Sequence, residues 1–306
     1  MKVFIDGAAG TTGLRLRRRL IERPDVTLLT LPDEVRKDPA ARASRMNDAD
    51  VVFLCLPDAA AIEAVDLVEN PDTVVIDTST AHRVAPGWTY GFAELPGARE
   101  KLRHAKRIAN PGCHASGFVA LVAPLTAEGA LPKDACLSCF SLTGYTGGGN
   151  KMIAAYESAG RDPLLDAPRQ YGLSQEHKHL PEMKTYADLF NAPVFCPVVA
   201  DFPVGMEVTV PLFGSQLRYG IRDVKEIYRD YYREGLIRCV EQADEEGFLS
   251  AAAMAGRDDM QITVAGNGER MLLIARFDNL GKGASGAAIQ NMNLACGLDE
   301  TAGLIV

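Results

Sequence analysis

A cysteine that follows a proline-glycine pair is the residue with the clearest catalytic potential. It ends the segment Asn110–Cys113, in which Pro111-Gly112 interrupts a strand-like run at 107–109, and an apolar helical stretch follows at 118–125. Cys113 is therefore expected at or near a helix N-terminus. The helix dipole and free N–H groups there stabilise a thiolate, and a thiolate is a candidate covalent nucleophile.

The remaining cysteines have no comparable setting. Cys136 and Cys139 form a C-x-x-C inside a strand-like run with no second pair, so their side chains are expected on opposite faces and to be structural. The other cysteines are expected to act as small, buried hydrophobic residues; they are Cys55, Cys196, Cys239 and Cys296. The same role is the alternative for Cys113. An odd total of seven scattered cysteines favours reduced thiols over a disulfide framework.

A thiol nucleophile needs a proton acceptor, and two of the five histidines stand close together as His177 and His179. The alternative is an exposed polar loop before a helix that begins near Pro181. A metal site is disfavoured because no cysteine or carboxylate cluster nearby completes a zinc-like ligand set. The other histidines, His82, His104 and His114, could also serve as the base, but they lack a comparable setting.

A glycine series after the first strand-like run predicts a phosphate-binding turn. The segment Gly7-Ala8-Ala9-Gly10-Thr11-Thr12-Gly13 spaces its glycines three and three and leads directly into a helical stretch at 14–21. Such glycines permit a tight turn and a close backbone approach, and the helix N-terminus attracts a pyrophosphate. The alternative is an ordinary strand-to-helix turn without a ligand.

Charged residues beyond this turn leave the choice between NAD and NADP open. Asp33 and Glu34 stand where an acid binds the ribose 2′-hydroxyl of NAD. Arg36 and Lys37 are as close, and they could hold a 2′-phosphate or belong to a solvated charge cluster.

The sequence pattern divides the chain into two regions, which must position the glycine turn, the cysteine and the histidines. Short apolar runs alternate with helix-compatible stretches along residues 1–112, which predicts a parallel α/β sheet whose strand ends share one ligand-binding edge. Longer strand-like runs follow from about residue 113, as in 136–142, 207–213 and 271–277, and predict an α+β domain with a mixed sheet. Residues 284–296 are expected to form one more helix.

The composition excludes several classes of partner. The chain has 306 residues, 47% of them hydrophobic, and its 40 acids against 32 bases give a net charge of -8. That charge disfavours nucleic acid and anionic membranes as main partners, so an anionic ligand needs a local positive site. The chain contains no apolar stretch long enough to span a membrane and no signal peptide, and we expect a cytoplasmic protein.

Taken together, these motifs resemble those of the N-acetyl-gamma-glutamyl-phosphate reductases, arginine-biosynthesis enzymes, in their short-chain form. The similarity covers essentially the whole chain. The segments that carry it are Gly7–Gly13, Asp77–Arg83, Asn110–Cys113, Gly144–Gly149, His177–Glu182 and Gly281–Asn291. Asn150 departs from the pattern, because relatives more often carry a basic residue there.

The resemblance implies a semialdehyde dehydrogenase-like two-domain architecture. Residues 1–112 with 281–306 would form an NADP-binding α/β Rossmann domain to which a C-terminal helix returns. Residues 113–280 would form the catalytic and oligomerisation domain, an α+β domain with a mixed sheet. We expect a homo-oligomer, a dimer or tetramer.

The implied reaction is the NADPH-dependent reduction of an acyl phosphate to an aldehyde, through a Cys113 thioester and with release of phosphate. The resemblance gives His179, with His177, the acid–base role, and lets Glu182 orient an imidazole. The implied cofactor contacts are Gly7, Ala9, Gly10, Thr11, Thr12, Gly13, Ser79, Gly283 and Asn291. The implied substrate contacts are Asn110, Tyr145, Gly147, Gly148 and Lys151.

The loop from Tyr145 to Lys151 offers successive N–H groups and one ammonium to the substrate's phosphate. A structural turn before a helix is the alternative there. For the whole chain, the alternatives are an aspartate-semialdehyde dehydrogenase-type acyl-phosphate reductase, against which the run His177–Glu182 argues, and a nonenzymatic NADP-binding regulator with an idle Cys113.

Overall fold

The computed structural model describes all 306 residues and separates into two compact units. The first unit comprises Met1–Pro111 with Ala284–Leu304, and the second comprises Gly112–Gly283 with Ile305–Val306. The expected boundaries fell after residues 112 and 280. Gly283 lies in the second unit because its N–H, like that of Gly281, donates to the carbonyl of Asp278. Ile305 belongs there through its N–H bond to Asp258.

The first unit contains the predicted parallel sheet, with strand order β2-β1-β3-β4-β6-β5 and every pair parallel. The central strands β1, β3 and β4 are short apolar runs buried on both faces apart from Lys2, as expected of parallel strands, whereas the edge strand β2 is only partly buried. Their bounds are β1 Lys2–Asp6, β2 Thr27–Leu29, β3 Val51–Leu54, β4 Val74–Asp77, β5 Thr89–Tyr90 and β6 Arg107–Ala109.

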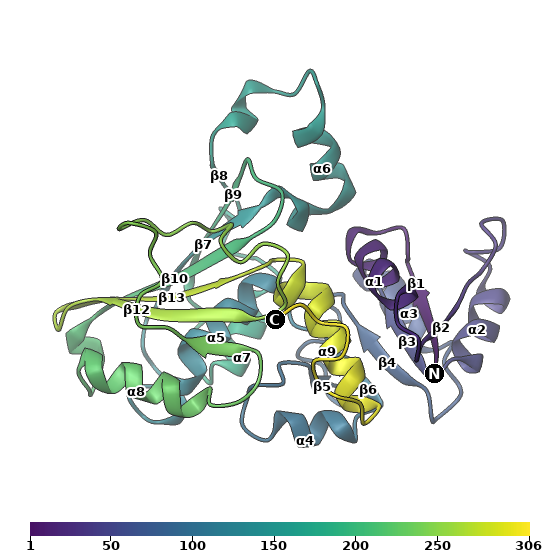
Figure 1. Cartoon of the computed structure of the whole chain (residues 1–306), viewed down its shortest axis with the longest axis horizontal. Helices are drawn as coiled ribbons and strands as arrows, with labels where there is room; N and C mark the ends of the chain where they lie inside the picture. Colours follow the sequence, from purple (N-terminus) through teal and green to yellow (C-terminus); the bar gives the residue numbers. More distant parts are fainter. The chain divides into compact units, whose positions relative to one another are not determined.

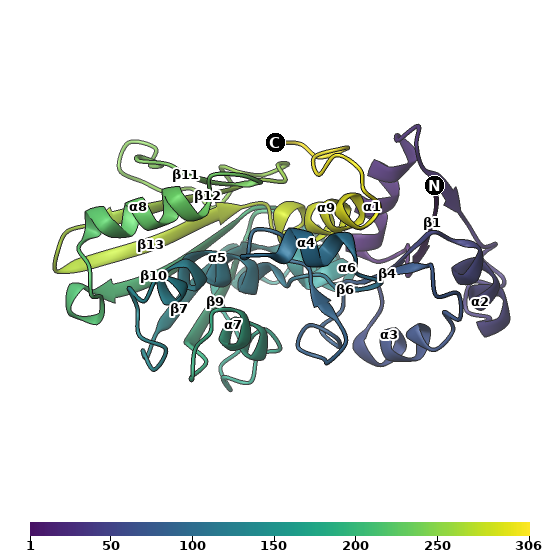
Figure 2. The same ribbon diagram turned by 90° about the horizontal axis from the view of Figure 1, so that it is seen from below.

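Helices cover this sheet over two separate hydrophobic cores. They are α1 Thr11–Ile21, α2 Pro39–Asp48, α3 Asp58–Val65, α4 Ala98–Arg103 and α9 Gly286–Ala295. Ile289 and Met292 of α9 are buried in the core formed with Val3 and Ile76 of the sheet. Figures 1 and 2 both show α9, from the C-terminal end of the chain, beside α4. The C-terminal helix α9 therefore packs into the core of the first unit.

The second unit contains a seven-stranded mixed sheet of order β11-β12-β13-β10-β7-β9-β8. The central pairs are antiparallel, whereas β7–β9 and β11–β12 are parallel, as an α+β domain predicts. The strands are β7 Ser138–Gly144, β8 Arg169–Gln170, β9 Val194–Ala200, β10 Met206–Phe213, β11 Ile237–Cys239, β12 Met260–Gly266 and β13 Arg270–Phe277.

Three helices lie on one face of this sheet, α5 Cys113–Ala127, α7 Leu180–Tyr186 and α8 Ile221–Tyr231 (Figure 1). The helix α5 is buried from His114 to Thr126, which explains its almost continuous apolar sequence. A fourth helix, α6 Gly149–Glu157, follows the short 3₁₀ turn Tyr145–Gly148. Phe140, Phe213 and Leu272 project from strands and are exposed, so part of the sheet surface is apolar and accessible.

Candidate active site

Cys113 is the first residue of α5, as the sequence predicted. Gly112 caps the helix in an extended conformation without a side-chain hydrogen bond, so the backbone N–H groups of the first turn lie at the cysteine. The cysteine is partly buried and not disulfide-bonded. Position and accessibility both suit a nucleophile.

Glu182 of α7 supports the start of this helix. Its Oε1 accepts a hydrogen bond of 2.7 Å from the N–H of Gly112, and its side chain is buried. The carboxylate predicted to orient an imidazole thus holds the residue that precedes the nucleophile.

His177 and His179 lie together, with ring centroids 4.8 Å apart, and the N–H of His179 donates to Nδ1 of His177 at 3.2 Å. A third imidazole completes a cluster, since the ring of His114 is 5.7 Å from His177 and 5.5 Å from His179. His114 had been a possible base without a distinctive setting in the sequence. The signal that could have singled it out is a polar aromatic residue within an otherwise apolar buried helix.

His114 is enclosed by two hydroxyl groups. Its Nδ1 lies 2.7 Å from Oγ of Ser141 on β7, and its Nε2 lies 2.7 Å from the hydroxyl of Tyr171. Burial, with a smaller contribution from the charge of His177, lowers the pKa of His114 to about 3. Burial also raises the pKa of Tyr171, and the negative charge of Cys113 adds to this rise. Tyr171 is therefore part of the site that the sequence did not reveal.

Gly283 borders the nucleophile. A Cβ placed on this glycine would lie 2.9 Å from Cβ of Cys113, closer than real Cβ contacts allow. The segment around it, Gly281–Ser285, is a π-helical turn. Asp278 fixes the turn, because its Oδ1 accepts hydrogen bonds from the N–H groups of Leu280 and Gly281. The family resemblance implies a cofactor contact for Gly283, and the structure adds this proximity to Cys113.

The glycine turn of the first unit has the predicted strand-to-helix geometry, with α1 beginning at Thr11 after the cap Gly10. Gly7 has a φ of +84°, and a Cβ there would lie 2.2 Å from the carbonyl oxygen of Cys55. A Cβ on Gly13 would lie 2.6 Å from the carbonyl oxygen of Gly7. Only glycine fits these two positions, and the first turn of α1 presents its N–H groups there.

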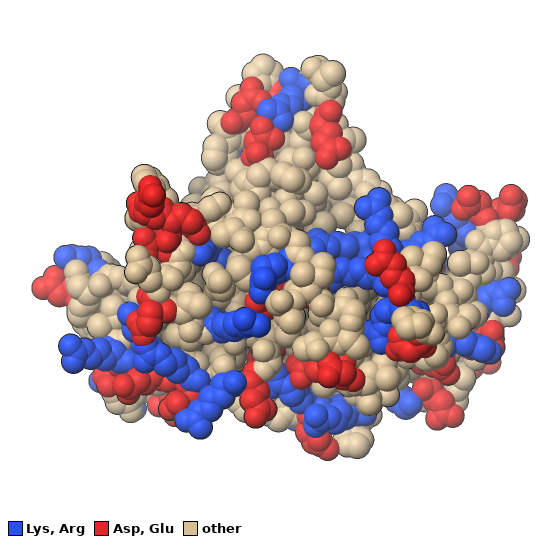
Figure 3. Space-filling model, in the orientation of Figure 1, with Lys and Arg blue, Asp and Glu red and all other residues tan.

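A cavity of 590 Å³ adjoins this turn, between the ends of β1 and β2 and the helix α1. Arg36 and Asp33 both line it, with their charged groups 3.8 Å apart, and the Asp33 side chain is 92% exposed. Arg42 also lines the cavity, but its guanidinium is paired with the buried Asp6 at 2.6 Å. Arg17 and Lys37 add two more cations to the lining. Basic side chains gather over α1 in Figure 3.

Asn110 uses all of its polar groups within the first unit. Its N–H donates to the carbonyl of Asp77 at 2.8 Å, and its carbonyl accepts from Nε of Arg83 at 3.0 Å. Its amide donates to the carbonyl of Ala284 and accepts from the Asn291 amide, each at 3.0 Å. Asn110, predicted to contact substrate, thus organises the end of β6.

Ser79 and Asn291 occupy polar, buried positions in the first unit. The hydroxyl of Ser79 donates to Oδ2 of Asp77 at 2.7 Å, and the same oxygen lies 2.6 Å from Nδ1 of His82. The side-chain oxygen of Asn291 is buried without a hydrogen-bond partner. A buried acceptor of this kind is suited to a ligand N–H donor.

The Tyr145 side chain is directed into the packing of α6. Its ring stacks on Tyr156 with centroids 4.8 Å apart, and its hydroxyl donates to Glu157 at 3.2 Å. Gly147 and Gly148 belong to the 3₁₀ turn before α6, and Lys151 is exposed in the first turn of that helix.

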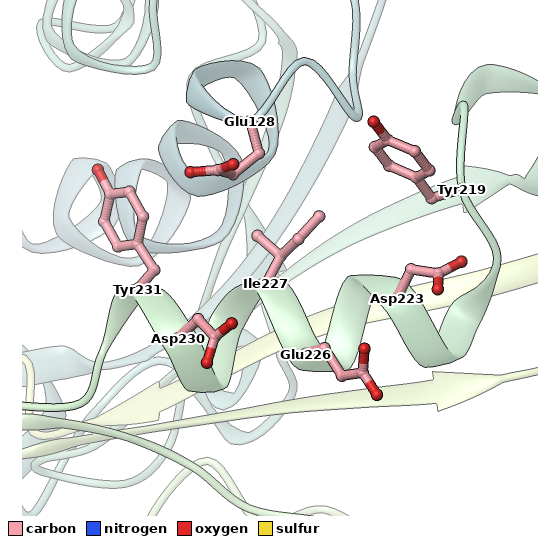
Figure 4. A pocket seen from close by; sticks show the side chains of 7 residues that line it. All are labelled: Glu128, Tyr219, Asp223, Glu226, Ile227, Asp230 and Tyr231. Atoms are coloured by element: carbon pink, nitrogen blue, oxygen red, sulfur yellow. The ribbon is translucent and has the colours of Figure 1, made fainter.

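A second pocket, of 520 Å³, lies along α8 and is drawn in Figure 4. Asp223, Glu226 and Asp230 line it from α8, together with Glu128 from the end of α5. None of its lining residues is a cysteine, histidine or cation, so it is unrelated to the nucleophile. No group of three or more His, Cys, Asp or Glu side chains is arranged to hold a metal ion, and no helix is long and apolar enough to cross a membrane.

Comparison with known proteins gives a consistent result. The family described as "Semialdehyde dehydrogenase, NAD binding domain" matches residues 2–105, and "Semialdehyde dehydrogenase, dimerisation domain" matches residues 113–279. The N-acetyl-gamma-glutamyl-phosphate reductase of Brucella anthropi is 46% identical over 97% of this chain and 98% of its own. The N-acetyl-gamma-glutamyl-phosphate reductase of Sinorhizobium medicae is 45% identical over 96% of this chain and 98% of its own.

Among solved structures, aspartate semialdehyde dehydrogenase II of Vibrio cholerae covers 96% of this chain and 98% of its own with a TM-score of 0.72. The aspartate semialdehyde dehydrogenase of Candida albicans, solved with NADP, covers 96% of this chain and 97% of its own with a TM-score of 0.67. Both are 17% identical to this chain, so they establish the fold alone.

Proposed function

Since this chain belongs to the semialdehyde dehydrogenase family, and within it to the N-acetyl-gamma-glutamyl-phosphate reductases, we propose that it reduces N-acetyl-gamma-glutamyl phosphate through a thioester on Cys113. The observation that carries this mechanism is the position of Cys113 at the N-terminus of α5, where it is partly buried and precedes His114, whose ring lies 5.7 Å from that of His177 and 5.5 Å from that of His179.

In the proposed first step, the Cys113 thiolate attacks the acyl carbonyl, and the carbon–oxygen bond to phosphate breaks as the thioester forms. The helix N-terminus stabilises the thiolate, and phosphate leaves as an anion. A bound reduced nicotinamide supplies the hydride for the second step. The thiohemiacetal on Cys113 then collapses to release the aldehyde and the free thiolate.

His179 and His177 are the proposed acid–base groups. One imidazole takes the proton of the Cys113 thiol and returns a proton where negative charge develops on substrate oxygen. Glu182 contributes by holding Gly112 in place, because its hydrogen bond fixes the backbone before the nucleophile. We therefore propose two roles for Glu182: it supports this backbone, and it orients an imidazole, as the resemblance implies.

The residues of the first unit fit a nicotinamide dinucleotide. Gly7 and Gly13 let the turn pack tightly against the backbone, and the first turn of α1, with Ala9, Thr11 and Thr12, is the proposed site of the pyrophosphate. We assign the unpaired oxygen of Asn291 to the carboxamide of the nicotinamide. Ser79 and Gly283 remain proposed contacts.

NADP is the proposed form of the cofactor. Arg17, Arg36 and Lys37 line the cavity beside the turn and are suited to a 2′-phosphate. Asp33 lines it too, but this carboxylate is almost fully solvated and accompanied by Arg36.

For the substrate's phosphate, we propose the N–H groups at Gly147 and Gly148 with the ammonium of Lys151. A homo-oligomer is the proposed assembly. The match to a dimerisation domain and the exposed apolar side chains of the sheet, Phe140, Phe213 and Leu272, support it.

The test is a phosphate-dependent oxidation assay with two aldehydes, N-acetylglutamate semialdehyde and aspartate semialdehyde, each with NADP and NAD. The expected result is turnover of the first aldehyde with NADP. Preference for aspartate semialdehyde would contradict the proposed substrate, and unchanged turnover in Cys113→Ser would contradict the thioester.

A further inference from the structure

Asp77, the last residue of β4, carries a fully buried carboxylate whose partners all lie in the loop that follows. Its Oδ1 accepts the N–H of Ser79 at 2.9 Å. Its Oδ2 lies 2.7 Å from the hydroxyl of Ser79 and 2.6 Å from Nδ1 of His82. No lysine or arginine forms an ion pair with it. A charge buried in this way depends on its hydrogen bonds, so each of the three donors contributes to holding it.

The carboxylate fixes the direction of the two hydrogen bonds at Oδ2. A carboxylate at neutral pH only accepts, so the hydroxyl of Ser79 and the Nδ1–H of His82 both donate to Asp77. The oxygen of Ser79 keeps two lone pairs, and one of them accepts the N–H of Ala81 at 3.2 Å. Its proton is already used. Toward any further partner, Ser79 is therefore an acceptor.

His82 provides the only hydrogen bond to this carboxylate that does not come from Ser79. The two bonds from Ser79 cannot prevent Asp77 and Ser79 from moving together. The bond from His82 can, because its ring is buried and stacks on Trp88, with centroids 4.0 Å apart and planes 14° apart. Trp88 in turn packs against the hydrophobic core of the first unit. The imidazole thus ties the Ser79 hydroxyl to a packed part of this unit.

Ser79 and Asn291 provide two acceptors at the same edge of the first sheet. Ser79 follows β4, and Asn110 follows the neighbouring strand β6. The N–H of Asn110 donates to the carbonyl of Asp77 at 2.8 Å, and its side-chain oxygen accepts the amide of Asn291 at 3.0 Å. The side-chain oxygen of Asn291 is unpartnered. Two neutral acceptors suit a ligand group with N–H or O–H donors, and they do not suit a phosphate, whose oxygens accept.

The nicotinamide nucleoside of the proposed cofactor has such donors in its carboxamide and its ribose hydroxyls. We propose that His82 is a positioning residue, which through Asp77 holds the oxygen of Ser79 as the acceptor for one of these donors. This role depends on the proposed function, because Ser79 is a proposed cofactor contact. An acceptor that is already oriented binds its donor with less loss of conformational freedom, which lowers the Kd.

The test is calorimetric titration of the substrate-free protein with NADPH, in two variants that separate the two contacts of His82. His82→Phe keeps an aromatic ring on Trp88 but has no N–H, whereas His82→Asn keeps an N–H at the position of Nδ1 but has no ring. In His82→Phe the Kd for NADPH should rise about tenfold, because a hydrogen bond to a carboxylate is lost. In His82→Asn the Kd should stay close to that of the unaltered protein. The exposed His104→Phe is the control and should leave it unchanged.

Hydrogen exchange of the peptide that contains Ser79 and Ala81 gives a readout that needs no cofactor. The N–H groups of these residues donate to Oδ1 of Asp77 and to the hydroxyl oxygen of Ser79. Their exchange should be faster in His82→Phe than in His82→Asn, because the loop opens more often without the donor. A role of the ring in packing alone would give the opposite order, both in exchange and in Kd.

An analogue of NADPH with an acetyl group in place of the carboxamide identifies the donor. If the carboxamide donates to Ser79, His82→Phe should bind this analogue as well as the unaltered protein does. If a ribose hydroxyl donates, the tenfold weakening should persist. Ser79→Ala removes the acceptor itself and should weaken NADPH binding, with little further effect when combined with His82→Phe. It also tests the contact should His82→Phe fail to fold.

Equal Kd values for NADPH in His82→Phe, His82→Asn and the unaltered protein would overturn the role of His82. An unchanged Kd in Ser79→Ala would overturn the contact that His82 is proposed to position. Failure of the proposed function would appear differently, as turnover retained in Cys113→Ser. Absence of NADPH binding to the unaltered protein would remove both.

Discussion

Oε1 of Glu182 accepts the N–H of Gly112 at 2.7 Å, so a carboxylate on α7 fixes the backbone immediately before the nucleophile. Glu182→Ala should leave this buried N–H without an acceptor and lower the free energy of unfolding by about 1–3 kcal/mol. Glu182→Gln retains an acceptor oxygen and should retain most of the stability. Denaturant titrations of both variants check this, and equal losses would contradict the hydrogen-bond explanation.

The contact between Gly283 and Cys113 predicts that Gly283→Ala moves the nucleophile. The added Cβ would lie 2.9 Å from Cβ of Cys113, and turnover should fall on the order of 10²-fold because a small displacement of a reacting group is enough. Gly160→Ala is the control, since a Cβ there meets no atom within 4 Å. Similar activity of the two variants would show that the site tolerates the contact.

Stability should depend on pH through His114. Its pKa is about 3 in the folded chain, mainly because of burial, against an ordinary value of 6.5. Between these pH values the unfolded chain binds a proton that the folded chain does not. The free energy of unfolding should therefore fall on acidification through this window, by up to about 1.4 kcal/mol per pH unit from this residue.

His114→Gln should flatten that dependence. Urea titrations at a series of pH values, with the unaltered protein beside the variant, give the difference because all other titrating groups are shared. Identical slopes for the two proteins would contradict the burial of a neutral imidazole.

Replacing His179 by Asn should lower turnover on the order of 10² to 10⁴-fold if this residue is the acid–base group. His177→Asn is the paired measurement, because the two rings are 4.8 Å apart and share one neighbour, His114. A negligible loss in His179→Asn with a large loss in His177→Asn would transfer the role to His177.

Cofactor preference should depend on Arg36 and Lys37. Changing both to Ala removes two cations from the cavity beside the glycine turn, and the KM for NADPH should rise on the order of 10- to 100-fold. The KM for NADH is the internal control and should change little. Equal losses with both cofactors would place the 2′-phosphate elsewhere.

The features that sequence analysis predicted depend on short segments. The Gly7–Gly13 turn and the helix start at Cys113 follow from residues that are neighbours in the chain, and both appear as expected. The two-domain fold also followed, because the strand-like runs are short and buried in one region and longer in the other.

The contacts that sequence analysis missed join residues far apart in the chain. Tyr171 reaches His114 across 57 positions, and Glu182 reaches Gly112 across 70. No periodicity or spacing encodes such pairs, because they arise from the packing of the loop before α7 and of β7 and β9 around α5. The partners of Asn110 and Tyr145 are likewise set by the tertiary structure, and their substrate contacts stay predictions.

The return of α9 to the first sheet has a consequence for synthesis on the ribosome. Residues 284–304 complete a hydrophobic core whose other members lie before residue 112. Residues 1–111 therefore leave the ribosome long before the helix that completes their core, and this core stays incomplete until nearly the whole polypeptide has been translated. Ribosome-stalled chains that end before residue 284 should remain sensitive to protease within residues 1–111, and release of the final segment should protect this region.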